Sequence, residues 1–208
     1  MTKNASVQMV NIDSAIPAES RRVRLTIVMA IAALLSVMFV GSPAEKASAY
    51  TLVGCKFPTS SIPYSGGAGP SGYSNLTALL DWVGNTDITG MPTTTTATPR
   101  IDFQWDYFGA SGWSGLTAIP NCSSTGGLHA GVVSILINRS YLDSYSVNDR
   151  TSVTSHEIGH AIGLDHVGTS GGACATTPLM NGYDAFRWST CGIYLTQTDD
   201  RNGANYLY

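Results

Sequence analysis

The sequence predicts an α+β domain of two lobes arranged around one long helix. Residues 131–138 (GVVSILIN) are apolar and β-branched, the pattern of a central strand. Residues 101–107 (IDFQWDY) alternate apolar and polar side chains, as a half-buried strand does. Residues 146–164 carry apolar side chains at helical spacing and include Gly163, a residue at which helices commonly end.

The first half of the domain supplies one helix between irregular segments. Residues 56–72 are interrupted by Pro and Gly, with a short strand expected near residues 62–64. Residues 74–83 (SNLTALLDWV) predict a helix, because apolar side chains recur at helical spacing at Leu76, Leu79, Leu80 and Val83. Residues 90–99 (GMPTTTTATP) are polar and predict a loop.

The second half adds an edge strand and two helices. Residues 113–119 (WSGLTAI) predict another strand, which Pro120 ends. The long helix over residues 146–164 can be capped by Ser146 or Asn148. Residues 196–208 (TQTDDRNGANYLY) predict a closing helix despite an internal glycine.

The N-terminus has the order of a secretory signal. Four residues, RRVR, precede an uncharged run of 16 residues at positions 25–40, and Ala47, Ser48 and Ala49 form a small-residue cleavage site. We therefore expect residues 1–49 to be a signal peptide and residues 50–208 to be one secreted domain. An uncleaved anchor is the alternative, although 16 residues are fewer than the roughly 20 that span a bilayer. Ser20 before an arginine pair also leaves twin-arginine export open.

Charge excludes one class of partner. Residues 50–208 contain six Lys or Arg against eleven Asp or Glu, and the basic residues form no cluster. Nucleic acid is therefore not an expected partner. We expect a soluble monomer with no stable membrane association once the signal is removed.

Four cysteines lie beyond the expected cleavage site, and none forms a C-x-x-C pair. An even number in an exported chain favours disulfides over a cysteine metal site. Three pairings are possible. We favour Cys55 with Cys122 and Cys174 with Cys191, because each bond then closes a separate loop region.

The stretch HEIGHAIGLDH, residues 156–166, contains three of the four histidines of the chain. His156 and His160 are four apart, so a helix places both imidazoles on one face, within reach of one metal ion. Gly163 permits a sharp turn that returns His166 as a third ligand. Three protein ligands leave a coordination position for water, as in catalytic zinc sites. Glu157 is the only glutamate in residues 50–208 and is placed to act on that water.

The pattern H-E-x-x-H-x-x-G-x-x-H resembles the signature of the metzincin metallopeptidases, and HEIGHAIGLDH is most similar to the matrixin branch. The resemblance extends from about residue 115 to residue 208. It implies a zincin/metzincin-like fold: a small, twisted, mostly parallel sheet with an antiparallel edge strand, a long active-site helix, a methionine turn and a C-terminal helix. It implies one catalytic Zn²⁺ ion as the cofactor.

The same resemblance suggests further site residues. Met180, 14 residues after His166, corresponds to the methionine turn. An extended peptide or protein substrate would pair with the edge strand at Leu116, Thr117, Ala118 and Ile119. Tyr183 would face the zinc or the pocket, or else be a half-buried aromatic residue. The residues after Met180 differ from the usual pocket wall, which leaves the subsite preference open.

Three features of matrixins have no clear counterpart. The second, structural zinc needs additional histidines, and only His129 remains, so we expect that site to be missing and His129 to lie in a loop. No spacing of oxygen ligands predicts calcium, which stays uncertain. The family's latency cysteine and propeptide have no match between residue 49 and the domain.

The sequence therefore predicts a secreted zinc endopeptidase. Zinc held by three histidines lowers the pKa of its bound water toward ~7, Glu157 accepts the proton as general base, and the leaving amine then receives it. Two alternatives stay open: a catalytically silent module that binds peptide or wall polymer, and a zinc amidase.

Overall fold

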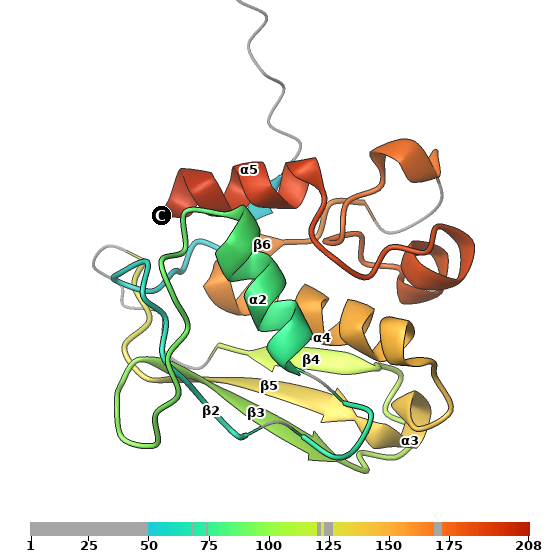
Figure 1. Ribbon diagram of the computed structural model, residues 1–208, viewed down its shortest axis with the longest axis horizontal. Coiled ribbons are helices and arrows are strands. Elements are labelled where there is room, and N and C mark those ends of the chain that lie inside the picture. Colours follow the sequence, from blue (N-terminus) through green and yellow to red (C-terminus); the bar gives the residue numbers. More distant parts are fainter. Residues whose placement is uncertain (1–49, 68, 74, 120–121, 123–126, 169–171) are drawn as a thin grey trace, which may run out of the picture. The chain divides into compact units, whose positions relative to one another are not determined.

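The computed structural model describes residues 50–208 apart from residues 68, 74, 120–121, 123–126 and 169–171. Within it, a four-stranded sheet lies beneath the helices (Figure 1). The strand order is β2-β3-β5-β4, with bounds Tyr64–Ser65, Arg100–Asp106, Val132–Asn138 and Gly115–Ala118. β2, β3 and β5 run parallel, and β4 is antiparallel to β5. The α+β class, the central position of residues 132–138 and the antiparallel edge strand are as the sequence predicts.

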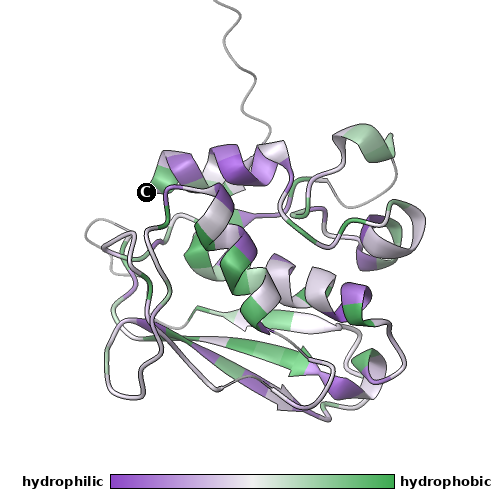
Figure 2. Ribbon diagram, in the orientation of Figure 1, coloured by the Kyte–Doolittle hydropathy of each residue, from purple (hydrophilic) through white to green (hydrophobic). Residues whose placement is uncertain are grey.

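Alternation of apolar side chains gives the sheet one buried face. In β5, Val133, Ile135 and Ile137 are buried, and in β3 the buried residues are Ile101 and Phe103. These branched and aromatic side chains suit a pleated surface that is covered by helices. Figure 2 shows β5 as mostly hydrophobic, β3 with hydrophobic and hydrophilic residues along its length, and hydrophobic residues gathered on α2 above them.

Two helices cover the sheet, α2 (Asn75–Asn85) and α4 (Val147–Ile162). They are tied together at Trp82, whose indole Nε1 donates to the carbonyl of Ser155 at 3.0 Å. Ser146 caps α4 in a reciprocal capping box with Asp149. The helix therefore starts at a residue that the sequence offered as a cap.

The buried face of α2 differs from the predicted one. Ala78, Leu79 and Trp82 are buried, whereas Leu76 and Leu80 are 52% and 60% exposed. Positions 75, 78, 79 and 82 follow the i, i+3, i+4, i+7 spacing of a single helical stripe. The large side chain of Trp82 on that stripe packs against α4. This orientation of the helix leaves Leu76 and Leu80 facing solvent.

Short elements without periodicity connect these parts. β1 (Thr51–Leu52) pairs antiparallel with β6 (Leu164–Asp165), and Val53 N–H donates to the carbonyl of Gly163 at 3.0 Å. The first described residues are thereby fixed beside the end of α4. The remaining elements are α3, the 3₁₀ turn η1, the π-helix η2 and α5, with bounds Arg139–Leu142, Cys174–Thr176, Ala185–Thr190 and Thr198–Leu207.

Two disulfides close loops on this framework. Cys55 is bonded to Cys122 and Cys174 to Cys191, the pairing favoured from the sequence, with Cα–Cα distances of 5.7 and 5.1 Å. The sequence separations are 67 and 17 residues. By chain entropy the links contribute about 4 and about 3 kcal/mol.

The described residues from Tyr50 to Tyr208 pack as one unit. The expected signal peptide, residues 1–49, lies outside the described residues. None of the described helices has the length and apolar character needed to cross a membrane.

Candidate metal centre

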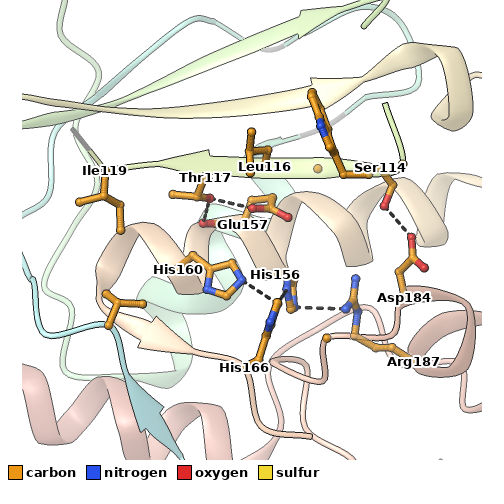
Figure 3. Close-up of a pocket in the computed structure, with 15 residues that line it drawn as sticks. Ser114, Leu116, Thr117, Ile119, His156, Glu157, His160, His166, Asp184 and Arg187 are labelled. Atoms are coloured by element: carbon orange, nitrogen blue, oxygen red, sulfur yellow. Dashed lines mark hydrogen bonds between the residues drawn. The ribbon is translucent and has the colours of Figure 1, made fainter. Parts of the chain in front are cut away.

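Three imidazoles converge at the C-terminal end of α4 (Figure 3). His156 and His160 lie one turn apart, and His166 returns to them from the chain that follows the helix. The Nε2 atom of His166 is 3.1 Å from Nε2 of His156 and 3.0 Å from Nε2 of His160. The structure brings these three residues together, as the sequence predicts.

The outer ring nitrogens determine which tautomer the histidines adopt. Nδ1 of His156 lies 2.8 Å from the carbonyl of Leu179, and Nδ1 of His160 lies 2.9 Å from that of Leu164. A carbonyl only accepts, so each Nδ1 carries the proton and each Nε2 presents a lone pair to the other rings. Lone pairs at this separation repel each other unless a cation lies between them.

A zinc ion fits this donor set. Metal–nitrogen bonds of about 2.0–2.1 Å in tetrahedral geometry place two ligand nitrogens roughly 3.3 Å apart. The Nε2 separations of 3.0 and 3.1 Å are close to that value. Nitrogen ligands without a carboxylate suit zinc better than calcium or magnesium.

Burial keeps the three rings neutral. It lowers the pKa of His156 well below its ordinary value, with the nearby positive charge of Arg187 acting in the same direction. Burial lowers the pKa of His160 to about 4, and it lowers that of His166 as well. Neutral imidazole is the form that binds metal, so the site is ready for an ion at neutral pH without releasing protons.

Gly163 makes the turn that brings His166 back. Its φ of 118° lies in the region that favours glycine. A Cβ here would be 2.7 Å from the carbonyl oxygen of Cys55 and 2.9 Å from Leu207 Cδ1. Both backbone conformation and space therefore require glycine.

Glu157 lies beside the two helix histidines, on the side of α4 that faces β4. Its side chain is buried, and Thr117 Oγ1 lies 2.8 Å from the carboxylate and 2.9 Å from the Glu157 carbonyl. Burial raises the pKa of Glu157 to about 7, although the Thr117 hydroxyl and the charge of Arg187 oppose the shift. A carboxylate whose pKa lies near neutrality can both accept and return a proton.

The turn at Met180 lies beneath His156. Met180 is buried, and a Cβ on Gly159 of α4 would collide with its sulfur. Gly159 thus allows the helix and the turn to approach closely. Buried Asp200 of α5 accepts hydrogen bonds from the N–H groups of Leu179, Met180 and Gln197 at 2.8, 2.9 and 2.7 Å. Burial raises the pKa of this carboxyl to about 6.

Replacing Asp200 with asparagine is expected to lower the free energy of unfolding by about 2–4 kcal/mol, because the new amide NH₂ faces N–H donors that lose their acceptor. The Leu179 carbonyl that orients His156 would loosen with the turn, so zinc affinity should fall by about 10- to 100-fold. Urea unfolding and competition with a chromophoric chelator measure the two effects. Exposed Asp87→Asn is the matched control, and equal values for both variants would contradict the prediction.

The histidines and Glu157 open onto a cavity of about 410 Å³. Of the residues proposed to bind substrate, Leu116, Thr117 and Ile119 line it. Ala118 and Tyr183 do not appear among its lining residues, and Tyr183 is 52% exposed. The turn places Gly182, not Tyr183, against the His166 ring, where a Cβ would lie 3.1 Å away.

Other lining residues were not identified from the sequence. Ser114 donates to Asp184 at 2.5 Å across the cavity, and fully buried Arg187 lies beside His156 (Figure 3). Val53, from the segment after β1, also lines the cavity. The sequence signal for Asp184 and Arg187 was their place in the segment after Met180, which differed from the matrixin pattern.

His129 packs against the last turn of α4. It is buried, with Nε2 2.9 Å from the Ala161 carbonyl and Nδ1 3.2 Å from Cys55 Sγ. Its backbone forms an isolated antiparallel β-bridge with Cys122, which the first disulfide joins to Cys55. These contacts tie the helix end to that disulfide, and in the described part of the chain they do not include the three histidines of the candidate site.

No protein-family model matches this chain, and no curated protein matches it. Solved structures match it, among them a chain of the GM1-bound form of the ECX AB5 holotoxin. That match has 11% identity and a TM-score of 0.45, and it covers 77% of this chain and 88% of that chain. Similarity at this level identifies neither a family nor an activity, so the function must be argued from the site itself.

Proposed function

We propose that the protein is a secreted, zinc-dependent endopeptidase of the metzincin type. One observation carries the proposal: three imidazoles whose ring nitrogens converge share an open cavity with a buried carboxylate. His156, His160 and His166 would hold the ion. Zinc bound there would polarise a carbonyl and acidify a water molecule.

Glu157 would move the proton. Its carboxylate would accept a proton from the attacking water and return it to the nitrogen of the leaving amine. The Thr117 hydroxyl, 2.8 Å from that carboxylate, would keep it pointing along the cavity. The buried position of Glu157 excludes bulk water, which strengthens its interaction with a bound substrate.

The edge strand β4 would orient the substrate. Among the described strands it is the last of the sheet and pairs only with β5, so its outer edge would accept another strand. Leu116, which is 41% exposed, lies on this edge beside the cavity. An extended peptide added there would run past the histidines, which favours unfolded or loop segments of proteins.

Export is part of the proposal. It rests on the signal-like order of residues 1–49 and on the two disulfides, which persist in oxidising compartments.

The test is cleavage of unfolded casein and of a peptide library by protein that begins at Tyr50. We expect hydrolysis that a chelator abolishes and that one equivalent of zinc restores, with cleavage sites mapped by mass spectrometry. Zinc-loaded protein that binds peptides but cleaves none would indicate the silent module. Hydrolysis of non-peptide amides alone would indicate the amidase.

A further inference from the structure

Arg187 is a buried cation at the wall of the cavity. Its side chain is 2% exposed and lines the same cavity as the three histidines and Glu157. Among the described residues, Arg139 and Asp143 form an ion pair at 3.3 Å. No described carboxylate lies within 4.0 Å of the Arg187 guanidinium. A charge that is removed from water in this way is costly unless another group compensates it.

Neutral acceptors occupy only some of the N–H groups of the guanidinium. Nε donates to Ser152 Oγ at 3.0 Å and Nη1 to the Asn181 carbonyl at 2.6 Å. Nη1 also lies 3.1 Å from Nδ1 of His156, but that nitrogen already donates to Leu179, and two donors do not bond. No hydrogen bond found in the described part of the chain uses Nη2.

Asp184 is the carboxylate whose charge most favours the Arg187 cation, but no hydrogen bond in the described part of the chain joins the two side chains. Asp184 lines the cavity too, but its carboxylate accepts from Ser114 Oγ at 2.5 Å and from its neighbour Ala185 N–H at 2.7 Å. Figure 3 shows the guanidinium between His156 and Asp184. A divalent ion on the histidines together with Arg187 outweighs the two carboxylates of Glu157 and Asp184, leaving one positive charge in excess.

We propose that Arg187 determines specificity by binding a carboxylate of the substrate beside the scissile bond. The proposal rests on the proposed peptidase function and names its substrate class: peptides with Asp or Glu next to the cleaved bond, or with a free C-terminal carboxylate one residue away from it. A guanidinium fork matches a carboxylate in shape, and the pairing is strong where water is excluded. The cavity that Arg187 lines has a volume of about 410 Å³, which is room for such a side chain.

The kinetic test uses matched peptides that differ in one group. We expect kcat/KM for Asp to exceed that for Asn, and Glu that for Gln, by about 10- to 100-fold, as a charge-assisted hydrogen bond gives. Amidation of the C-terminus separates the two sources of carboxylate: a rate lost on amidation assigns the chain end, and an unchanged rate assigns the side chain. Equal rates for all of these pairs would overturn the proposal.

Variants then assign the preference to the residue. Arg187→Met should reduce the Asp/Asn ratio to within about 2-fold, and Arg187→Lys should retain part of it, because lysine is a point charge without the fork. Asp184→Asn should raise the ratio, because it removes a repelling charge. Thermal midpoint and zinc content show whether each variant is folded. If Arg187→Met does not fold, Arg187→Lys and Asp184→Asn decide, and an unchanged ratio in both would count against Arg187.

A binding measurement tests the role of Arg187 without relying on catalysis. Zinc-loaded Glu157→Gln protein is titrated with the same Asp and Asn peptides by calorimetry, and tighter binding of Asp by about 10-fold is expected. Cleavage without preference would contradict the role of Arg187 and leave the endopeptidase proposal standing. Preferential binding of the Asp peptide without any cleavage by the wild-type protein would support the role of Arg187 and contradict the endopeptidase proposal.

Discussion

Replacing Glu157 with glutamine is expected to lower kcat/KM for peptide hydrolysis by about 10²- to 10⁴-fold, the contribution of a positioned general acid and base. Glutamine has nearly the same shape and can still accept the Thr117 hydrogen bond, which is 2.8 Å long in the structure. It cannot take a proton from water or pass one to an amine. Since Glu157 is not among the residues whose ligand atoms converge, zinc content should stay at one equivalent.

Initial rates on a fluorescent peptide and metal analysis of the same preparation measure the two effects together. Exposed Asp87→Asn makes the same chemical change away from the cavity and should leave the rate within about 2-fold, as surface substitutions usually do. Wild-type turnover by the Glu157→Gln protein would remove the role given to this carboxylate. Loss of zinc in parallel with activity would instead show that Glu157 supports the metal site.

The three-histidine group was predictable because its geometry is local. His156 and His160 are related by one helical turn, and Gly163 ends that helix with a φ of 118°, so 11 consecutive residues contain all three histidines. Helix geometry and the conformational freedom of glycine are properties of the chain itself. The long strands and helices were predictable for the same reason, because burial of one face leaves a periodic pattern in the sequence.

Features that depend on tertiary packing were not predictable. β1 and β6 have two residues each, too few for any periodicity. The buried stripe of α2 is set by its partner helix through Trp82, and leucines alone indicated a different face. Arg187 would be expected at the surface as a charged residue, yet it is buried by a turn that Asp200 holds from the C-terminal helix.

Replacing Gly163 with alanine is expected to reduce the free energy of unfolding by about 2–5 kcal/mol, from backbone strain and from overpacking. The added Cβ would lie 2.7 Å from a backbone oxygen of Cys55, which the disulfide to Cys122 restrains, so the chain after α4 must shift instead. His166 is three residues further on and would move with it. Zinc affinity should therefore fall by more than about 100-fold, which exceeds the usual effect of replacing a residue that hydrogen-bonds to a metal ligand.

Three comparisons separate the causes of this loss. Gly54→Ala has a similar strain, with φ of 80° and nothing within 4 Å of the new Cβ, so it should cost only about 1–2 kcal/mol and leave zinc affinity unchanged. Gly84→Ala, in the last turn of α2 with open space around it, should be neutral or slightly stabilising. His166→Ala should lose zinc affinity like Gly163→Ala while the zinc-free protein keeps its stability, because no backbone is strained. Urea unfolding of the zinc-free proteins and chelator competition give both quantities, and a Gly163→Ala protein with wild-type zinc affinity would mean that the turn does not position the third ligand.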